Sequence, residues 1–183
     1  MSLLYKSMDL IYGQIRIRRA TSEDAQTLTN WWNDGHIMAH AGFPKGLGIT
    51  VEEVTKQLEP GSLMLLCRDV PIGELHYRKA GECSVEIGIK ICDTDYQNKG
   101  LGKIALSMLI QELFRWGYQT IILDTNLSNT RAQHVYEALG FQKIRINHHS
   151  WKNQLGQLQS SVDYKLSESD FRNYLSGENL CRE

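Results

Sequence analysis

The chain has 183 residues and a nearly balanced charge, with 20 basic and 21 acidic side chains and a net charge of −1 at pH 7. No basic stripe indicates nucleic-acid binding, and no apolar run approaches the roughly twenty residues that a membrane-spanning helix needs. This length fits one domain with a full core. We expect a single domain across residues 1–183, with its core at about 15–166 and a tail at 167–183.

The four cysteines show no Cys-x-x-Cys spacing, and the first eight residues hold no apolar stretch of signal-peptide length. We therefore expect reduced thiols and a cytoplasmic location. The adjacent pair His148 and His149 is more typical of a loop or strand surface than of two metal ligands. The sequence predicts no metal site.

Residues 14–19 alternate isoleucine with arginine, and this period of two predicts a strand with one polar face. Residues 21–24, Thr-Ser-Glu-Asp, supply N-cap oxygens and first-turn acids for a helix that should end near Gly35, where glycine can adopt the left-handed C-cap. Trp31 and Trp32 are neighbours on this helix and diverge by about 100° around its axis. We therefore expect one of them to pack in the core.

A glycine-rich loop is expected at 36–48, and a capping box at Thr50 and Glu53 predicts a short helix to about residue 58. Strands joined by tight turns should follow at 62–68, 72–78 and 83–92.

Residues 96–103 read Tyr-Gln-Asn-Lys-Gly-Leu-Gly-Lys and lie between the last of these strands and an apolar series of helical period. Unpaired N–H groups at the start of a helix, together with its dipole, form an anion site. Gly100 and Gly102 lack a Cβ, so a phosphate can approach the backbone closely. Lys99 and Lys103 add positive charge. The segment therefore predicts a phosphate-binding turn.

The spacing of this turn is neither that of a P-loop nor that of a Rossmann fingerprint. Its pattern, Gln-x-x-Gly-x-Gly, resembles the acetyl-CoA pyrophosphate loop of the GCN5-related N-acetyltransferase (GNAT) superfamily. A second apolar strand at 118–125 precedes a segment that resembles the other GNAT signature, Asn-x-x-Ala-x-x-x-Tyr-x-x-x-Gly-Phe. Its fixed positions are Asn129, Ala132, Tyr136, Gly140 and Phe141.

The resemblance implies an α+β fold with a central mixed antiparallel and parallel sheet, splayed into a V and flanked by helices. The order of predicted elements agrees, since hairpin-linked strands precede strand–helix–strand–helix–strand and suggest an antiparallel half joined to a parallel half. After residue 141 we expect a strand at 142–147, a loop at 148–156, a strand at 157–166 and a short helix at 167–175. The last eight residues are polar and are expected to fray.

The resemblance also implies acetyl-CoA as co-substrate, with no metal. Backbone groups of Lys90, Ile91 and Cys92 would bind the pantetheine arm like an added strand. Asn129 would hydrogen-bond the same arm, or cap the helix that follows it. The pyrophosphate would lie on Gln97, Asn98, Lys99, Gly100, Leu101, Gly102 and Lys103.

Acetyl transfer needs a neutral amine and a proton for the departing thiolate. The resemblance assigns Tyr136 as the general acid, with a core tyrosine as the alternative. For the general base we rank Glu86 slightly ahead of Asp124, and a chain of waters could replace both.

On the acceptor side we expect one of Trp31 and Trp32, together with Trp151. Residues 31–34 resemble the first helix of two GNAT branches, the ribosomal-protein N-terminal acetyltransferases and the aminoglycoside 6′-N-acetyltransferases, and decide for neither. The function expected is transfer of an acetyl group to a primary amine of a small molecule or peptide N-terminus in a ternary complex. The alternative is a non-catalytic acyl-CoA sensor. Edge strands near the C-terminus also suggest a homodimer.

Overall fold

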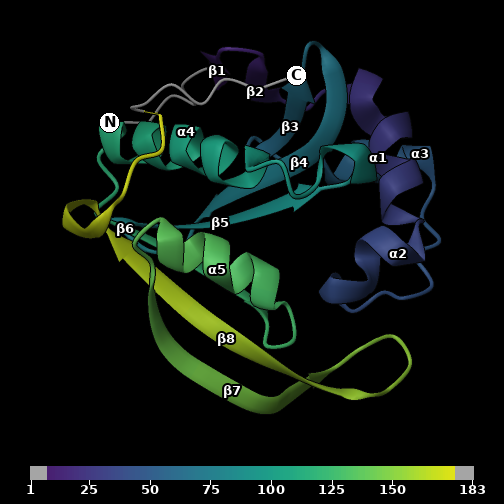
Figure 1. Ribbon diagram of the computed structural model, residues 1–183. Helices are drawn as coiled ribbons and strands as arrows, with labels where there is room; N and C mark the ends of the chain where they lie inside the picture. The colour runs from purple at the N-terminus through teal and green to yellow at the C-terminus, as the bar shows by residue number, and fades with distance from the viewer. Residues whose placement is uncertain (1–7, 176–183) are drawn as a thin grey trace.

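The computed structural model describes residues 8–175, which form an α+β domain on an eight-stranded mixed sheet (Figure 1). The strands lie in the order β1-β2-β3-β4-β5-β6-β8-β7. Their bounds are Asp9–Tyr12 (β1), Ile15–Arg19 (β2), Ser62–Cys67 (β3), Val70–Lys79 (β4), Ser84–Ile91 (β5), Thr120–Asn126 (β6), Gln142–Lys152 (β7) and Leu158–Ser167 (β8). The helices are Ala25–Trp32 (α1), Gly35–Met38 (α2), Val51–Gln57 (α3), Leu101–Arg115 (α4) and Thr130–Ala138 (α5). The predicted α+β architecture is confirmed.

Strand β3 separates two hydrophobic clusters, because successive side chains of a strand point to opposite faces. Leu63 and Leu65 pack in the larger cluster, together with the buried sides of α4 and α5. Met64 and Leu66 pack in the smaller one, with α1 and α3. The sheet is thus a central layer with α4 and α5 on one face and the N-terminal helices on the other.

The V arises where β5 and β6 part. They pair in parallel at Ser84–Thr120, Val85–Ile121 and Glu86–Ile122, whereas β5 continues to Ile91 and β6 to Asn126. Helix α4 connects the two strands as a crossover, the usual link between parallel neighbours. The rest of β5 is left without a β6 neighbour on that side.

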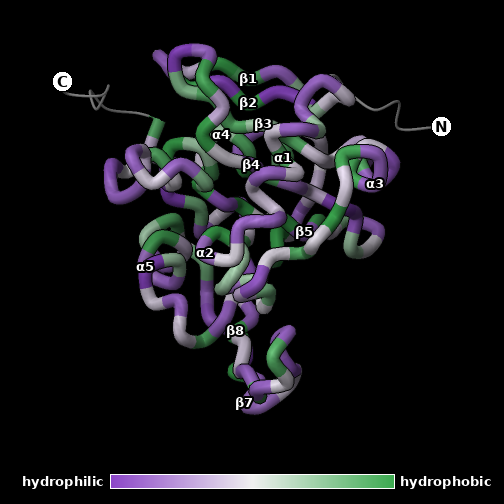
Figure 2. Tube along the Cα trace, turned by 90° about the vertical axis from the view of Figure 1, so that its right-hand side faces the viewer, coloured by the Kyte–Doolittle hydropathy of each residue, from purple (hydrophilic) through white to green (hydrophobic). Residues whose placement is uncertain are grey.

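The expected parallel half is smaller than the element order suggested. Strand β8 inserts antiparallel between β6 and β7, so β5–β6 is the only parallel pair among the described strands. The β7–β8 hairpin ends the sheet, at the bottom of the domain in Figure 2.

Two differences appear near the N-terminus. A short strand at Asp9–Tyr12, which the sequence did not predict, pairs with β2 across a turn at Gly13. Gly35 does not adopt the left-handed conformation and instead begins α2. A Cβ on Gly35 would lie 2.2 Å from the carbonyl oxygen of Pro44, so close backbone packing explains this glycine.

Two differences also appear near the C-terminus. Strand β7 runs on to Lys152, so most of the expected loop at 148–156 is strand. The expected helix at 167–175 is reduced to a single 3₁₀ turn, Glu168–Asp170. The fraying expected for the last eight residues lies outside the described part of the chain.

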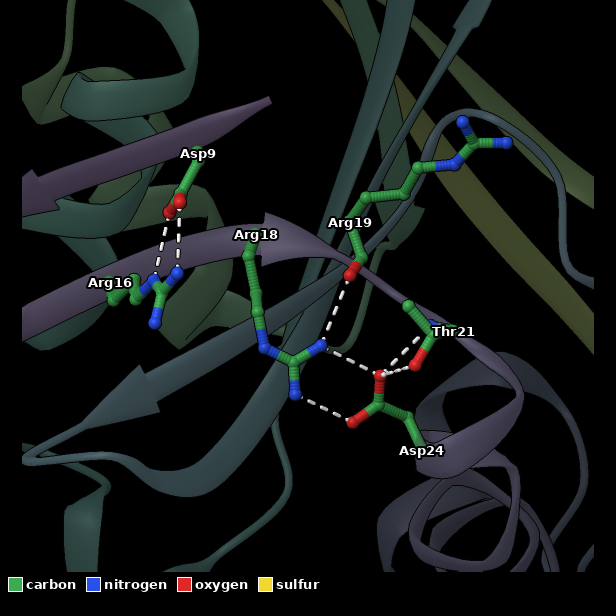
Figure 3. Close-up of polar contacts among 6 residues, drawn as sticks. All are labelled: Asp9, Arg16, Arg18, Arg19, Thr21 and Asp24. Atoms are coloured by element: carbon green, nitrogen blue, oxygen red, sulfur yellow. Dashed lines mark hydrogen bonds and ion pairs between the residues drawn. The ribbon is translucent and has the colours of Figure 1, made fainter. Parts of the chain in front are cut away.

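An ion pair fixes the entry to α1. Arg18 on β2 donates from both terminal nitrogens to Asp24, at 2.7 and 2.8 Å, and Asp24 also accepts from the backbone N–H of Thr21 at 2.8 Å (Figure 3). Burial would raise the pKa of Asp24, but the hydrogen bonds from Arg18 and Thr21 outweigh it and lower that pKa. The carboxylate joins β2 to the start of the helix.

Within residues 8–175, no helix is long and apolar enough to cross a membrane.

Candidate active site

The turn before α4 presents free backbone donors. Across the described chain, the amides of residues 98–102 donate no hydrogen bond to another protein atom. Gly100 caps the helix with a φ of 77°, and Asn98 has a φ of 60°. Successive N–H groups in such a turn form a concave anion site at the positive end of the helix.

The two glycines of this turn have different roles. Gly100 needs its left-handed conformation, which a Cβ would strain. At Gly102 a Cβ would meet only the Cδ1 of Ile91, at an ordinary 3.8 Å. The fold therefore leaves room for a side chain at Gly102, and this room is available to a ligand.

Side chains hold the turn in place. Gln97 donates to the carbonyl of Ile91 at 2.9 Å, and Arg131 at the start of α5 donates to the side chains of Gln97 and Asn98 at 3.3 and 3.2 Å. The side chain of Leu101 is buried in the core, so this residue can offer a ligand only its backbone amide. The turn is therefore tied to both β5 and α5.

The two lysines of the turn lie against aromatic rings. The Nζ of Lys99 is 5.7 Å from the ring centre of Tyr96, and that of Lys103 is 4.9 Å from that of Tyr174. Both charges stay close to the turn, as the sequence suggested.

The open edge of β5 presents different backbone groups from those expected. Along an antiparallel strand, N–H and C=O groups point alternately toward and away from the partner strand. Cys92 donates its N–H to the carbonyl of Ile72 at 2.9 Å, so Cys92 and, by alternation, Lys90 face β4. The groups of Ile89 and Ile91 face the opening of the V. A ligand that runs along this edge like an added strand would therefore bond to Ile89 and Ile91, whereas Lys90 and Cys92 of the expected set face β4.

Tyr136 packs in the core, and its hydroxyl group is left without a partner within residues 8–175. Its side chain is 5% exposed and packs edge-on against Phe141 and Tyr164. Among the described residues, however, its hydroxyl is neither hydrogen-bonded nor fully buried. Burial, and then the charge of Asp124, raises the pKa of Tyr136 to about 12. The ring belongs to the core, and the hydroxyl keeps a proton and a path to solvent.

Asn129 is the N-cap of α5. Its side-chain oxygen accepts the backbone N–H of Ala132 at 3.2 Å. Capping accounts for this oxygen, and the side-chain NH₂ group makes no hydrogen bond to another described residue, so it remains able to donate to a ligand.

Three carboxylates lie on the face of the sheet opposite α4 and α5, where the V opens. Glu86 accepts from Arg78 at 2.8 and 3.0 Å. Asp163, the neighbour of Asp124 across β6–β8, accepts from Arg145 at 2.9 Å. Asp124 is exposed and makes no hydrogen bond or ion pair with another described residue. Of the two expected bases, Asp124 is thus the unpaired one.

Neighbouring charges act on Asp124. Partial burial, followed by the negative charges of Glu86 and Asp163, raises its pKa. A carboxylate under this repulsion gains more from a nearby cation than an isolated one does.

A pocket of about 340 Å³ opens between this face and the N-terminal helices. Trp32 donates its indole N–H to both oxygens of Glu74, at 2.9 and 3.0 Å. Lys90 bonds to Glu74 at 3.0 Å and to the sulfur of Met38 at 3.1 Å. His76 also lines this pocket. Its ionisable groups thus come from alternate residues of β4 and from Lys90 on β5.

Sequence reasoning missed Glu74 and His76. The available signal was the alternation of Glu74, His76 and Arg78 along the strand predicted at 72–78, which places all three on one face.

Both neighbouring tryptophans of α1 pack partly buried against the smaller cluster. Trp32 also lines the pocket, and Trp31 does not. Trp151 lies farther away, on β7, where its ring covers Gly42 closely enough to exclude a Cβ there. The tip of the β7–β8 hairpin therefore docks on the loop after α2.

No group of three or more His, Cys, Asp or Glu side chains within residues 8–175 is placed to hold a metal ion.

Comparison with known proteins yields relatives in sequence and in structure. Ribosomal protein bS18-alanine N-acetyltransferase of Escherichia coli K12 is 44% identical over 54 residues, which are 30% of this chain and 36% of that protein. The enzyme of the same name from Salmonella typhimurium LT2 is 38% identical over 64 residues, 35% of this chain and 43% of that protein. The chain thus matches less than half the length of these curated relatives.

Solved structures share the fold over most of the chain. An acetyltransferase (GNAT family) from Bacillus anthracis has a TM-score of 0.77 at 20% identity, covering 88% of this chain and 99% of that one. Ribosomal-protein-alanine N-acetyltransferase from Brucella melitensis has a TM-score of 0.70 at 17% identity, covering 82% and 98%. The model of the acetyltransferase (GNAT) family matches residues 6–141. The chain therefore belongs to the acetyltransferase (GNAT) family.

Proposed function

We propose that this protein transfers the acetyl group of acetyl-CoA directly to a primary amine, of a small molecule or a peptide N-terminus, while both are bound. The proposal rests on one observation: the V-shaped opening between β5 and β6 is continuous with the phosphate-binding turn before α4. Beyond Glu86 the edge of β5 is open as far as Ile91, and the strand then leads to the free amides of residues 98–102.

The cofactor would follow this path. Its pyrophosphate would accept the amides of residues 98–102, and its pantetheine arm would run back along β5 and bond to Ile89 and Ile91. The five residues of β5 beyond Glu86 span roughly 16 Å. The thioester would then lie near the apex of the V, beside Glu86.

Tyr136 would be the general acid for the departing thiolate. Its raised pKa keeps the phenol protonated at neutral pH. A thiolate that forms in the same desolvated site is also strengthened as a base, so proton transfer to it remains favourable.

Asp124, rather than Glu86, would attract the ammonium form of the acceptor. Glu86 is already paired with Arg78, while Asp124 is free of ion pairs among the described residues. An ammonium entering the V relieves the repulsion that Asp124 experiences from its neighbouring carboxylates.

The acceptor would enter through the pocket lined by Trp32, Glu74 and Lys90. Apolar walls and a paired carboxylate suit a neutral, partly apolar group beside the reacting amine. The relatives' names add the N-terminal alanine of a protein as one acceptor to test.

The test is release of free thiol from acetyl-CoA in the presence of polyamines, aminoglycosides, amino acids and peptides with N-terminal alanine. We expect turnover with at least one class, and double-reciprocal plots that intersect, as a ternary complex requires. Tight binding of acetyl-CoA by calorimetry with no turnover on any class would instead support the sensor alternative. Parallel plots would contradict direct transfer.

A further inference from the structure

The imidazole of His76 occupies the space that a side chain of β5 would fill. His76 on β4 is aligned with Gly88 on β5. A Cβ on Gly88 would lie 2.1 Å from Cε1 of His76, 2.8 Å from Nδ1 and 2.9 Å from Nε2. The ring therefore lies over the backbone of Gly88, and any larger residue there would displace it.

This position is beside the apex of the V. Gly88 is two residues beyond Glu86, the last residue of β5 that is aligned with β6. The proposed path of the pantetheine arm brings the thioester to the same level of β5. His76 also lines the acceptor pocket with Glu74 and Lys90. The imidazole thus borders both the pocket and the proposed reaction centre.

Within the described chain, the imidazole has free ring nitrogens that can take up one proton. Its two ring nitrogens make no hydrogen bond to another described residue. Desolvation of the ring lowers the pKa of His76, which favours the neutral form that can accept a proton. Charged groups from three strands interact electrostatically with the imidazole. They are Glu74 and Arg78 on β4, Glu86 and Lys90 on β5, and Asp124 on β6.

Most of these charges are already balanced. Glu74 pairs with Lys90, and Glu86 pairs with Arg78. Asp124 alone is unpaired among them, and it would balance the positive charge of a protonated imidazole.

We propose that His76 is the proton acceptor for the attacking amine, an inference that rests on the proposed function. The N–H bond of the ammonium breaks, and the proton passes to a ring nitrogen of His76. The amine nitrogen bonds to the thioester carbon, the C–S bond breaks, and the thiolate takes the proton of Tyr136. The newly acylated nitrogen gives up its second proton, which returns Tyr136 to the phenol. The imidazolium then loses its proton to solvent, so the products are the amide, CoA thiol and one proton.

The experiment compares three variants, and a fourth for chemical rescue, with the wild-type chain on an acceptor that the wild type turns over. His76→Gln removes the titrating group. Gly88→Ala keeps every titrating group but pushes the imidazole away. His134→Gln, at an exposed position on α5, is the matched control. The readouts are kcat as a function of pH and acetyl-CoA affinity by calorimetry.

We expect His76→Gln and Gly88→Ala to lose about 10²-fold in kcat near pH 7, with unchanged acetyl-CoA affinity. The kcat of the wild type should level off above the pKa of His76, whereas that of His76→Gln should keep rising toward the pKa of the amine. Added imidazole should restore part of the activity of a His76→Ala variant. His134→Gln should match the wild type.

Wild-type kcat and pH profile in His76→Gln would overturn the proposal, and so would full activity in Gly88→Ala. Failure of the proposed function is a separate result, since the wild type would then turn over no amine. If His76→Gln is misfolded, which loss of acetyl-CoA binding would show, the kcat and pH profile of Gly88→Ala test the proposal instead.

Discussion

Gln97 donates its side-chain N–H to the carbonyl of Ile91 at 2.9 Å and so joins the phosphate-binding turn to the end of β5. This carbonyl would otherwise point into the opening of the V without a partner. The bond thereby fixes the position of the free amides of residues 98–102 relative to the open edge of β5.

The first prediction concerns Gly102. A valine there meets only an ordinary contact in the protein, at 3.8 Å from Ile91, but its side chain occupies the space proposed for the pyrophosphate. We expect Gly102→Val to retain its melting temperature and to bind acetyl-CoA at least 10-fold more weakly by calorimetry. The control is Gly81→Val in the β4–β5 turn, where a Cβ also makes only ordinary contacts. Equal affinity in folded Gly102→Val would remove the turn from the account.

The second prediction concerns Tyr136. Replacement by phenylalanine keeps the ring that packs on Phe141 and Tyr164 and removes only the hydroxyl. If that hydroxyl protonates the thiolate, kcat should fall about 10²-fold with little change in acetyl-CoA affinity or stability. Matched steady-state rates in Tyr136→Phe and wild type would show that this residue serves only the core.

The third prediction separates the two carboxylates. Asp124→Asn removes the unpaired charge, so KM for a cationic acceptor should rise and the effect should weaken at high salt. Glu86→Gln breaks a pair with Arg78 on the sheet surface, so its main effect should be on stability, measured by thermal unfolding. A larger catalytic loss in Glu86→Gln than in Asp124→Asn, with a shifted pH–rate profile, would restore Glu86 as the base.

The fourth prediction concerns the entry to α1. Asp24→Ala removes the hydrogen bonds to Arg18 and Thr21 and should lower the free energy of unfolding by about 2 kcal/mol. Because the pKa of Asp24 is lowered in the folded state, its stabilisation is present above the unfolded pKa of about 4 and is lost as pH falls through the folded pKa.

The matched control for Asp24 is Asp9→Ala, which breaks the more exposed pair with Arg16 and should change stability little (Figure 3). Urea unfolding at pH 7 and pH 3 measures both variants. An equal loss for Asp9→Ala and Asp24→Ala, or a loss for Asp24→Ala that persists unchanged at pH 3, would contradict this account.

The parts of the site that the sequence predicted are local in the chain. The free amides around Gly100 follow from a glycine-bearing turn between a strand and a helix, and the capping by Asn129 follows from its place before an apolar helix. Each of these features is decided within a few residues of backbone, so spacing alone was sufficient.

The parts that were missed depend on strand register. His76 meets Gly88, and Glu74 meets Lys90, only because β4 and β5 pair in one alignment. The expectation for Lys90 and Cys92 depends on register in the same way, since a hydrogen bond to Ile72 decides which backbone groups face the V. The short strand at Asp9–Tyr12 gains its pairing from β2 rather than from its own residues.

The most direct test of acetyl transfer follows the acetyl group itself. Acetyl-CoA labelled with a heavy isotope in the acetyl group is incubated with the wild-type protein and the amine panel, and the products are measured by mass spectrometry. The account predicts labelled acetyl on the nitrogen of at least one amine, at a rate lowered about 10²-fold in Tyr136→Phe. Intact labelled acetyl-CoA that remains bound, with no labelled amine in any class, would contradict it.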